Sequence, residues 1–420
     1  MKEEIKERIE QICRCDIPEG YKKENGWIIP NNWSMRKGTN LFSFIRNGFV
    51  GTVTPYYCKD GIRYLQGTNI KNGKIVSEEV FFVTNEFHTK HPNSQLRTGD
   101  IVVIQSGAVG ECAVINKEYN GGNCHALIIM SPHDKTNSLW FSNLLNSPYS
   151  SKLLRGIITG NTIKHILASD MKKLEIPTPS VTEQKKIANI LTTQDRVIEL
   201  KENCLVEKQR QKKYLMQQLL TGKRRVSGFG GEWKIDRLGK LFLERKETNC
   251  EGLEMLAITG TQGIIPRKEL DLKDNSSEDK SKYLKVCVGD IGYNTMRMWQ
   301  GVSAYSNYEG IVSPAYTILK PSSSINAKYF AYLFKMPEII FLFYRYSQGL
   351  VDDTRNLKYE NFKKIRVFYP SDVKEQTAIA KVLSTADREI DLLRQDIEQE
   401  KKKKKALMQL LLTGIVRVKI

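Results

Sequence analysis

Several short patterns in the sequence approach catalytic or metal-binding motifs, but none has the spacing that the chemistry requires. The stretch from Thr54 to Tyr57 comes nearest to the [DN]PP[YF] motif of methyltransferases, yet it lacks the amide or carboxylate that would hold a target base. His88 and His91 form an HxxH pattern and Cys124 adjoins His125, without further ligands at zinc spacing. We therefore expect no catalytic residue and no metal site, and we predict that these histidines are loop or core residues.

Basic and amide side chains interleaved with aromatic residues in predicted loops favour nucleic-acid binding instead. Arginine can pair with guanine, and asparagine or glutamine with adenine, whereas lysine and tyrosine contact phosphates. In the first half of the chain the candidate DNA-binding residues are Arg63, Gln66, Asn69, Lys71, Gln105, Ser106, Asn161 and Lys164. In the second half they are Thr261, Gln262, Arg267, Lys268, Asn294, Arg297, Trp299, Gln300, Gln348, Arg355 and Asn356. Each residue alone is more often an ordinary loop residue, so the prediction rests on the set.

The overall charge is consistent with a polyanionic partner. Lysine and arginine number 65 against 47 acidic residues, so the net charge is +18, which favours nucleic acid. No apolar run approaches the roughly 18 residues needed to span a membrane. The first residues are charged and lack the apolar centre of a signal peptide. The eight cysteines are scattered, without a disulfide framework. We expect a cytoplasmic protein with no membrane association.

Two copies of one long helical segment must position these loops. The segment from Glu183 to Val226 recurs without a gap from Glu375 to Val418, 192 residues later (375 − 183). Apolar residues at a 4,3 spacing predict a coiled-coil seam. Its members are Ile187, Leu191, Ile198, Leu205, Leu215 and Leu219 in the first copy and Ile379, Leu383, Ile390, Leu393, Ile397, Leu407 and Leu411 in the second. Both copies end in Leu-Thr-Gly, where Gly222 and Gly414 can cap a helix in the left-handed conformation.

Polar residues interrupt the seam in the middle of the first copy. Its seam positions include Lys201, Lys208 and Lys212. In a centred antiparallel pair these lysines would face apolar residues of the second copy, namely Ile397, Ile390 and Ala386. An ammonium group next to an apolar side chain is costly unless it reaches solvent. We therefore expect tightly packed helix ends and a middle that is looser or covered by partner subunits.

A globular unit precedes each long helix, and the two units share landmarks. The first opens at Ile29 to Phe42 and the second at Gly230 to Phe242, each with an aligned tryptophan, Trp33 or Trp233, and a Leu-Phe pair that we expect in the core. A Gly-Asp-Ile turn precedes a strand in both units. Short β-branched and aromatic runs broken by Gly, Asn and Pro predict small sheets with loop tips. We predict an α+β fold: two small α/β domains separated by two long helices that form an antiparallel coiled coil, with a pseudo-twofold internal repeat.

Three features make the sequence resemble the specificity subunit of type I restriction-modification enzymes. The duplicated helices begin with EQxxIAxxL and end with LMQQLLTG or LMQLLLTG; the strands before them read LEIPTPS and IRVFYPS; the second unit contains GDIGYNTMRMWQG and GLVDDTRNLKYENFKKIRV. The resemblance covers essentially all of the chain and implies two target recognition domains, each reading half of a bipartite DNA site. We assign the first target recognition domain to residues 1-180, the central spacer helix to 181-226, the second target recognition domain to 227-372 and the C-terminal spacer helix to 373-420.

The resemblance further implies a non-catalytic subunit of a larger complex. Its coiled coil would hold two methyltransferase (modification) subunits, and restriction/translocase subunits would complete the assembly. The chain itself would carry no cofactor, whereas the complex would use S-adenosylmethionine, ATP and Mg2+. Because the two units differ in sequence, we expect an asymmetric site on double-stranded DNA. The alternative hypotheses are a recognition subunit of a methylation system that lacks a motor, and a coiled-coil interaction scaffold or RNA-binding protein.

Overall fold

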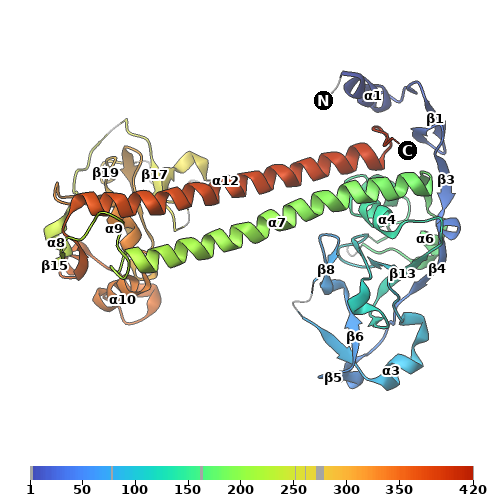
Figure 1. Cartoon of the computed structure of the whole chain (residues 1–420), viewed down its shortest axis with the longest axis horizontal. Coiled ribbons are helices and arrows are strands. Elements are labelled where there is room, and N and C mark those ends of the chain that lie inside the picture. Colours follow the sequence, from blue (N-terminus) through green and yellow to red (C-terminus); the bar gives the residue numbers. More distant parts are fainter. Residues whose placement is uncertain are drawn as a thin grey trace. The chain divides into compact units, whose positions relative to one another are not determined.

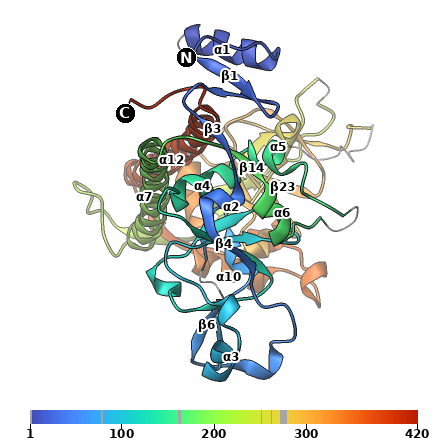
Figure 2. The same cartoon turned by 90° about the vertical axis from the view of Figure 1, so that its right-hand side faces the viewer.

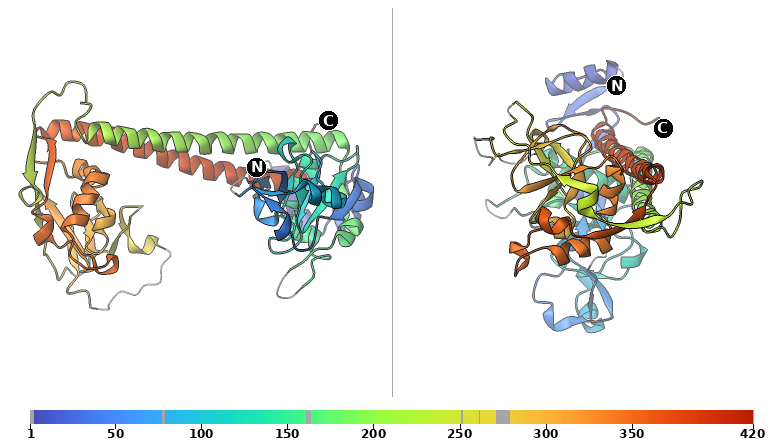
Figure 3. Two further views of the ribbon diagram at one scale, coloured as in Figure 1. Left: turned by 90° about the horizontal axis from the view of Figure 1, so that it is seen from below. Right: turned by 90° about the vertical axis from the view of Figure 1, so that its left-hand side faces the viewer.

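The structure is a computed structural model, and it describes residues 3–76, 79–160, 164–250, 252–260, 262–270 and 279–419. The chain forms two compact units, Met1–Lys201 with Asp396–Ile420, and Glu202–Gln395. Two long helices, α7 (Val181–Leu219) and α12 (Val373–Leu412), contribute one half each to both units. Figures 1 and 3 show these helices, green and red, running side by side.

The first unit is built around an antiparallel four-stranded sheet in the order β11-β10-β13-β4. A second, mixed sheet in the order β12-β6-β9-β5 carries the residues around Arg63. The elements before α7 are α1 (Glu3–Cys13), β1 (Tyr21–Glu24), β2 (Trp27–Pro30), β3 (Ser34–Lys37), α2 (Gly38–Leu41), β4 (Phe42–Asn47), η1 (Thr54–Tyr56), β5 (Tyr57–Cys58), β6 (Ile62–Leu65), η2 (Gly67–Asn69), β7 (Ile70–Lys71), β8 (Lys74–Ile75), β9 (Phe81–Val83), α3 (Asn85–Lys90), η3 (Pro92–Ser94), β10 (Ile101–Ile104), β11 (Cys112–Val114), η4 (Lys117–Tyr119), β12 (Asn123–Cys124), β13 (Leu127–Pro132), α4 (Ser138–Leu145), α5 (Ser150–Leu154), α6 (Ala168–Lys173) and β14 (Glu175–Thr178).

The second unit repeats the same central sheet in the order β21-β20-β23-β16. Its elements are β15 (Trp233–Arg237), α8 (Leu238–Leu241), β16 (Phe242–Glu244), β17 (Leu256–Ile258), β18 (Ile264–Pro266), η5 (Arg267–Glu269), β19 (Leu284–Val286), β20 (Ile291–Asn294), η6 (Met298–Gln300), β21 (Ser303–Tyr305), β22 (Gly310–Val312), β23 (Tyr316–Pro321), α9 (Ala327–Leu333), α10 (Pro337–Tyr346), η7 (Asp352–Thr354), α11 (Tyr359–Phe362) and β24 (Arg366–Pro370). In both units the entry strand pairs antiparallel with the strand that leads into a long helix, β3 with β14 (Figure 2) and β15 with β24.

The landmarks predicted from the sequence lie in the two cores. Trp33 and the pair Leu41-Phe42 are buried with Leu191 of α7 in the first unit. Leu241 and Phe242 are buried in the second, where Trp233 is only partly buried against the same cluster. The Gly-Asp-Ile turns precede β10 and β20 as predicted, and their glycines have positive φ. The short strands alternate with glycine-bearing loops because glycine admits left-handed turns at little cost.

The coiled-coil seam and its antiparallel direction are confirmed within each unit. In the first unit Asp195 pairs with Lys404 at 2.6 Å and Lys201 pairs with Asp396 at 2.8 Å, so α12 numbers fall as α7 numbers rise. Lys208 and Glu389, 2.7 Å apart, show the same direction in the second. All seam residues that were predicted are buried or partly buried.

The paired helices pack through apolar side chains at their ends and through ion pairs in their middle. Ile187, Leu191 and Leu411 join the core of the first unit, and Leu219 and Leu383 join that of the second. The ammonium groups of the three seam lysines bind carboxylates of α12 and so do not face apolar side chains alone. Lys201 pairs with Asp396 and Glu400. Lys208 pairs with Glu389, and Lys212 pairs with Asp387. These partners lie within three residues of the predicted facing positions, so the register was predicted correctly and the ion pairs were missed.

Both long helices end as predicted. Gly222 has φ of +73° and Gly414 has φ of +74°, so each glycine follows its helix in the left-handed conformation. None of the helices in the described part of the chain is long and apolar enough to cross a membrane.

Candidate nucleic-acid interface

In each unit we call the loop that carries candidate DNA-reading residues and leads from β10 to β11 (105–111) or from β20 to β21 (295–302) the reading loop. The reading loop of the first unit is held by His165, which the sequence did not single out. The Ser106 Oγ lies 2.6 Å from His165 Nδ1, and Gln105 Nε2 lies 3.1 Å from His165 Nε2. The backbone of Ile166 donates to Gln105 O at 3.1 Å. These contacts bring the loop after β10 together with the segment that carries exposed Lys164. Ser106 and Lys164 are therefore presented from one surface, while Asn161 lies outside the described residues.

The other candidates of the first unit are largely engaged inside the fold. Arg63 pairs with Glu118 at 3.1 Å and its guanidinium lies 5.4 Å from the centre of the Tyr119 ring. Asn69 is only 4% exposed, and its amide accepts from Gln66 N and donates to Glu79 O. An amide that is buried and bonded at both ends stabilises a turn, and the structure assigns Asn69 that role. Its choice from sequence rested on residue type alone. Gln66 donates to Tyr57 Oη at 2.8 Å, and Lys71 is exposed on β7.

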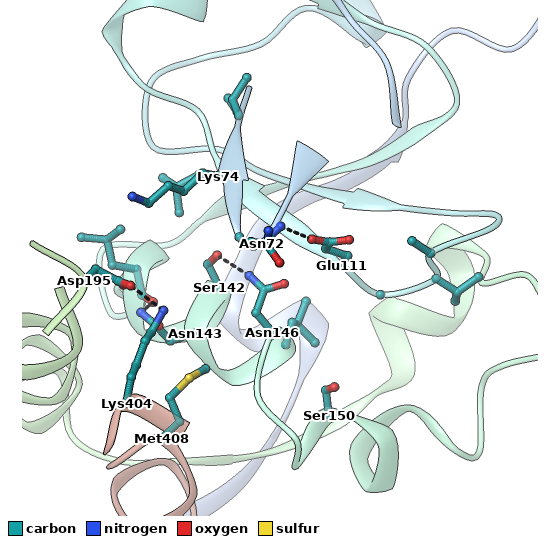
Figure 4. Close-up of a pocket in the computed structure, with 18 of the residues that line it drawn as sticks. Asn72, Lys74, Glu111, Ser142, Asn143, Asn146, Ser150, Asp195, Lys404 and Met408 are labelled. Atoms are coloured by element: carbon teal, nitrogen blue, oxygen red, sulfur yellow. Dashed lines mark hydrogen bonds and ion pairs between the residues drawn. The ribbon is translucent and has the colours of Figure 1, made fainter. Parts of the chain in front are cut away.

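A hollow of about 1210 Å³, lined by both polar and apolar side chains, lies between the loop after β10, the β7–β8 turn and this unit's halves of the long helices (Figure 4). Two ion pairs lie along it: Lys404 pairs with Asp195 at 2.6 Å and Lys74 with Glu199 at 3.4 Å. Asn146, which also lines it, bonds the backbone of Cys112 at 2.9 Å and 3.1 Å.

The second unit brings most of its candidates into one contiguous surface. Trp299 meets the Tyr344 ring edge-on at 6.3 Å. Arg355 lies over the same ring, 4.1 Å from its centre, and donates to Tyr344 Oη at 2.9 Å. The loop at Thr295 accepts a hydrogen bond from Leu357 N at 2.8 Å. This surface, which we call the Trp299 surface, comprises Arg297, Trp299, Gln300, Gln348, Arg355 and Asn356.

The Trp299 surface places aromatic rings beside exposed apolar side chains, and its Arg355 is partly buried and pairs with Asp352 at 2.8 Å. Leu350 is 99% exposed and Val351 and Met296 flank the same loops. Gln348 and Asn356 pair through two backbone hydrogen bonds of 2.9 Å and 2.7 Å, which hold the tip of the loop between them. Stacked arginine and aromatic side chains are suited to bases and sugar edges as well as to phosphates.

Three further candidates, Gln262, Arg267 and Lys268, lie on or beside the β17–β18 hairpin, and Asn294 ends β20. Lys268 pairs with Glu254 at 2.6 Å, and Gln262 is exposed at the turn. Arg267 is partly buried in η5, and the Asn294 Oδ1 accepts from Met296 N at 3.0 Å. Thr261 lies outside the described residues. None of these contacts tests whether the residues touch DNA, so their assignment stays a prediction.

Two equivalent junctions between the helices were missed by the sequence reasoning. In the first unit Arg417 donates to both carboxylate oxygens of Glu183 at 2.8 Å, and Trp33 Nε1 donates to the same carboxylate at 3.1 Å. In the second unit Arg225 donates to both oxygens of Glu375, at 2.5 Å and 2.6 Å. The start of each long helix is therefore bonded to the tail of the other.

The glutamine that follows each of these glutamates joins the helix to its globular unit. Gln184 accepts from Asn137 N at 2.8 Å and donates to Pro179 O at 3.0 Å. Gln376 accepts from Asn326 N at 2.7 Å and donates to Pro370 O at 2.9 Å. The EQ dipeptide at the head of each repeat is thus structural: the glutamate fixes the other helix and the glutamine fixes the sheet domain.

The histidines set aside in the sequence analysis bond within the fold. His88 Nδ1 lies 2.6 Å from Asn123 Oδ1, and Tyr64 Oη lies 3.1 Å from His125 Nδ1. Among the residues described, there is no group of three or more His, Cys, Asp and Glu side chains that could hold a metal ion.

Comparison with known proteins agrees with this architecture. A family model described as the type I restriction modification DNA specificity domain matches residues 30–208 and 259–401. The putative type I restriction enzyme MjaX specificity subunit of Methanocaldococcus jannaschii is 25% identical over 445 aligned positions, which cover 96% of this chain and 97% of that protein. The MjaVIII specificity subunit of the same organism is 27% identical, and the chain spans 49% of its length.

Solved structures share the fold at low sequence identity. The HsdS subunit from Thermoanaerobacter tengcongensis has a TM-score of 0.52 at 17% identity, covering 94% of this chain and 100% of that one. The type I restriction-modification system S subunit from M. genitalium has a TM-score of 0.54 at 17% identity, covering 93% and 97%. Since the family model covers most of both repeats, the chain belongs to the family of type I restriction modification DNA specificity domain proteins.

Proposed function

We propose that this chain reads an asymmetric, bipartite site on double-stranded DNA, with one globular unit on each half-site. The observation that carries the proposal is that the two units share one sheet framework but present different loops on it. The first offers Ser106 and Lys164, whereas the second offers Trp299 and Arg355 with their aromatic support. Different side chains on equal frameworks favour different base sequences in the two half-sites.

Two similar grooves on the paired helices support a partner that binds twice. One, of about 550 Å³, is lined by Ile190 of α7 and Val418; the other, of about 510 Å³, by Val382 of α12 and Val226. Both pairs are related by the repeat of 192 residues (382 − 190 and 418 − 226). Ile190 is 38% exposed and Val382 is 36% exposed, although both are apolar.

The partners proposed for these grooves are two adenine methyltransferase subunits. Catalysis, and with it the use of S-adenosylmethionine, would reside in them. ATP and Mg2+ would serve restriction/translocase subunits that join the same complex. In this proposal the chain itself contributes recognition and assembly and no catalytic residue. Replacing Ile190 and Val382 together by aspartate should abolish co-purification with the methyltransferase while leaving the helix content unchanged, because exposed seam-adjacent positions do not support the cores.

Mapping methylated adenines in host DNA tests the proposal. Cells that carry this chain and its methyltransferase should methylate one asymmetric bipartite sequence, and duplex binding should weaken steeply with salt because lysine and arginine contacts release counterions. Absence of duplex binding with the methyltransferase present would contradict it. Preference for RNA would instead favour the scaffold or RNA-binding alternative. Modification without cleavage of unmodified DNA in the host would favour a methylation system that lacks a motor.

A further inference from the structure

In each unit, a polar side chain just after helix α4 or α9 binds the backbone at the end of a loop that carries candidate DNA-reading residues. In the second unit Lys335 Nζ donates to Gly301 O at 2.7 Å, directly after Gln300 of the Trp299 surface. In the first unit Asn146 donates to Cys112 O at 2.9 Å and accepts from Cys112 N at 3.1 Å, at the end of the loop that begins with Gln105. Neither side chain belongs to the proposed DNA-contacting sets.

The two anchors occupy the same position of the internal repeat. Helices α4 and α9 are capped by Asn137 and Asn326, which are 189 residues apart (326 − 137), and Asn146 and Lys335 are separated by the same distance (335 − 146). Both anchors follow their helix by one or two residues. The side chains differ in length and charge, yet both end on the backbone between a loop and the next strand. Position in the fold, rather than residue type, is therefore what the two units share.

The anchored backbone has little freedom to move elsewhere. Gly301 has φ of +79°, and a Cβ added there would lie 2.7 Å from Ile340 of α10. Gly110, at the end of the other loop, has φ of +88°, and an added Cβ would lie 2.6 Å from Leu154. A carbonyl held by a fixed donor next to such a packed glycine sets the direction in which the preceding loop leaves the sheet.

The surroundings of Lys335 disfavour its positive charge. Burial lowers the pKa of Lys335 to about 8, and the nearby ammonium of Lys212 adds to the effect. The Lys212 charge is itself neutralised by Asp387, which also accepts from Tyr332 Oη at 2.6 Å. The anchor of the second unit's loop therefore lies close to the ion pair between Lys212 and Asp387.

We propose that Lys335 and Asn146 are positioning residues for DNA recognition, each setting the geometry of one reading loop without touching DNA. The proposal rests on the proposed function, since it assigns an effect on base discrimination. It states that the two residues act separately, each on the half-site read by its own unit. Without its anchor, the loop still carries the same side chains, but they can adopt several arrangements. Discrimination between base sequences therefore falls more than the affinity for DNA does.

The test compares base discrimination at the two half-sites in the complex with the methyltransferase. The wild-type complex first defines the recognised sequence by methylation mapping, and exchange of residues 227–370 shows which half belongs to the second unit. Affinities are then measured for this duplex and for duplexes altered at one base pair in either half. Lys335→Met should reduce discrimination in the second unit's half-site about tenfold and leave the other half unchanged. Asn146→Ala should do the reverse.

Matched variants separate positioning from general damage. Lys328→Met makes the same charge change on the exposed side of α9, and Asn143→Ala removes an amide that donates to Leu139 O of its own helix, so both should retain wild-type discrimination. Lys335→Arg keeps a hydrogen-bond donor at this position and should therefore retain most of the wild-type discrimination. This expectation can be tested even if Lys335→Met proves poorly folded. Unchanged discrimination in a folded Lys335→Met complex would overturn the inference, as would equal loss in both halves. A wild-type complex without a bipartite sequence would instead contradict the proposed function.

Discussion

The two helix junctions are built from the same residue types but differ in how completely they are bonded. Glu183 receives three hydrogen bonds, two from Arg417 and one from Trp33, and Trp33 is fully buried. Glu375 receives both bonds from Arg225, but in the described part of the chain the indole N–H of Trp233 has no hydrogen-bond partner. The repeat has therefore kept the charge pair that joins the helices, while the bond from the tryptophan is present at one junction alone.

The glycines that end the helices differ in a similar way. Both have a left-handed backbone, but a Cβ on Gly414 would lie 2.6 Å from Pro30, whereas a Cβ on Gly222 would lie 3.4 Å from Trp233, an ordinary contact. The first junction has no space for a Cβ atom at its glycine, whereas the second junction has space for one. Comparing matched substitutions at the two junctions separates the cost of backbone strain from the cost of packing.

The largest difference is expected for alanine at these glycines. Gly414→Ala should destabilise the protein by about 3 kcal/mol, because left-handed strain and overpacking add, whereas Gly222→Ala should cost about 1 to 2 kcal/mol from strain alone. Urea unfolding of the full chain, followed by circular dichroism, measures both. Equal shifts in the unfolding midpoint would show that the two junctions are equally packed.

Removing the glutamate charge should have the next largest effect. Glu183→Gln should cost about 2 to 3 kcal/mol, since it weakens three hydrogen bonds and leaves Arg417 without its partner, and Glu375→Gln should cost about 1 to 2 kcal/mol. Exchanging the two charges offers a check, because Glu183→Arg combined with Arg417→Glu should recover part of the lost stability. A greater loss from Glu375→Gln than from Glu183→Gln would reverse the ranking of the junctions.

The two tryptophans should differ in how much their substitution destabilises the protein. Trp33→Phe removes a donor to a buried carboxylate and should destabilise by about 1 kcal/mol beyond the loss of ring area. Trp233→Phe removes an N–H that has no partner among the described residues, so its cost should be close to that of the ring area alone. Thermal unfolding of the two variants side by side is sufficient, and a larger effect at Trp233 would mean that its N–H is in fact bonded in solution.

Much of this framework could be predicted from the sequence, because its signals are local or repeated. The 4,3 spacing predicted the seam, and the gapless repeat predicted that both units end in the same helix. The clamp from Arg417 to Glu183 could not be predicted, since its partners are 234 residues apart and neither residue type is specific to such a contact. Asn69 is an example of the opposite kind, a residue whose type alone suggested a ligand-binding role. Its burial, which the sequence does not reveal, instead indicates a structural role.

The smallest expected effect concerns pH and the central ion pairs. Hydrogen bonds from Lys201 and Gln194 lower the pKa of Glu400 to about 2. Because this pKa is lower in the folded state, the stabilisation from Glu400 is complete above about pH 4.5 and is lost as the pH falls toward 2. Glu400→Gln should flatten the acid limb of the stability curve slightly, whereas Glu398→Gln, at an exposed position of the same helix, should leave it unchanged. An identical acid limb in wild type and Glu400→Gln would exclude this contribution.

Exchange of one globular unit tests the central claim most directly. Residues 227–370 are replaced by the corresponding unit of another family member, leaving both long helices and the first unit intact, and methylated adenines are mapped in cells that contain the methyltransferase. If each unit reads its own half-site, one half of the methylated sequence changes and the other half and the spacer are retained. Changes in both halves, or in neither, in a chimera that still assembles would contradict the account.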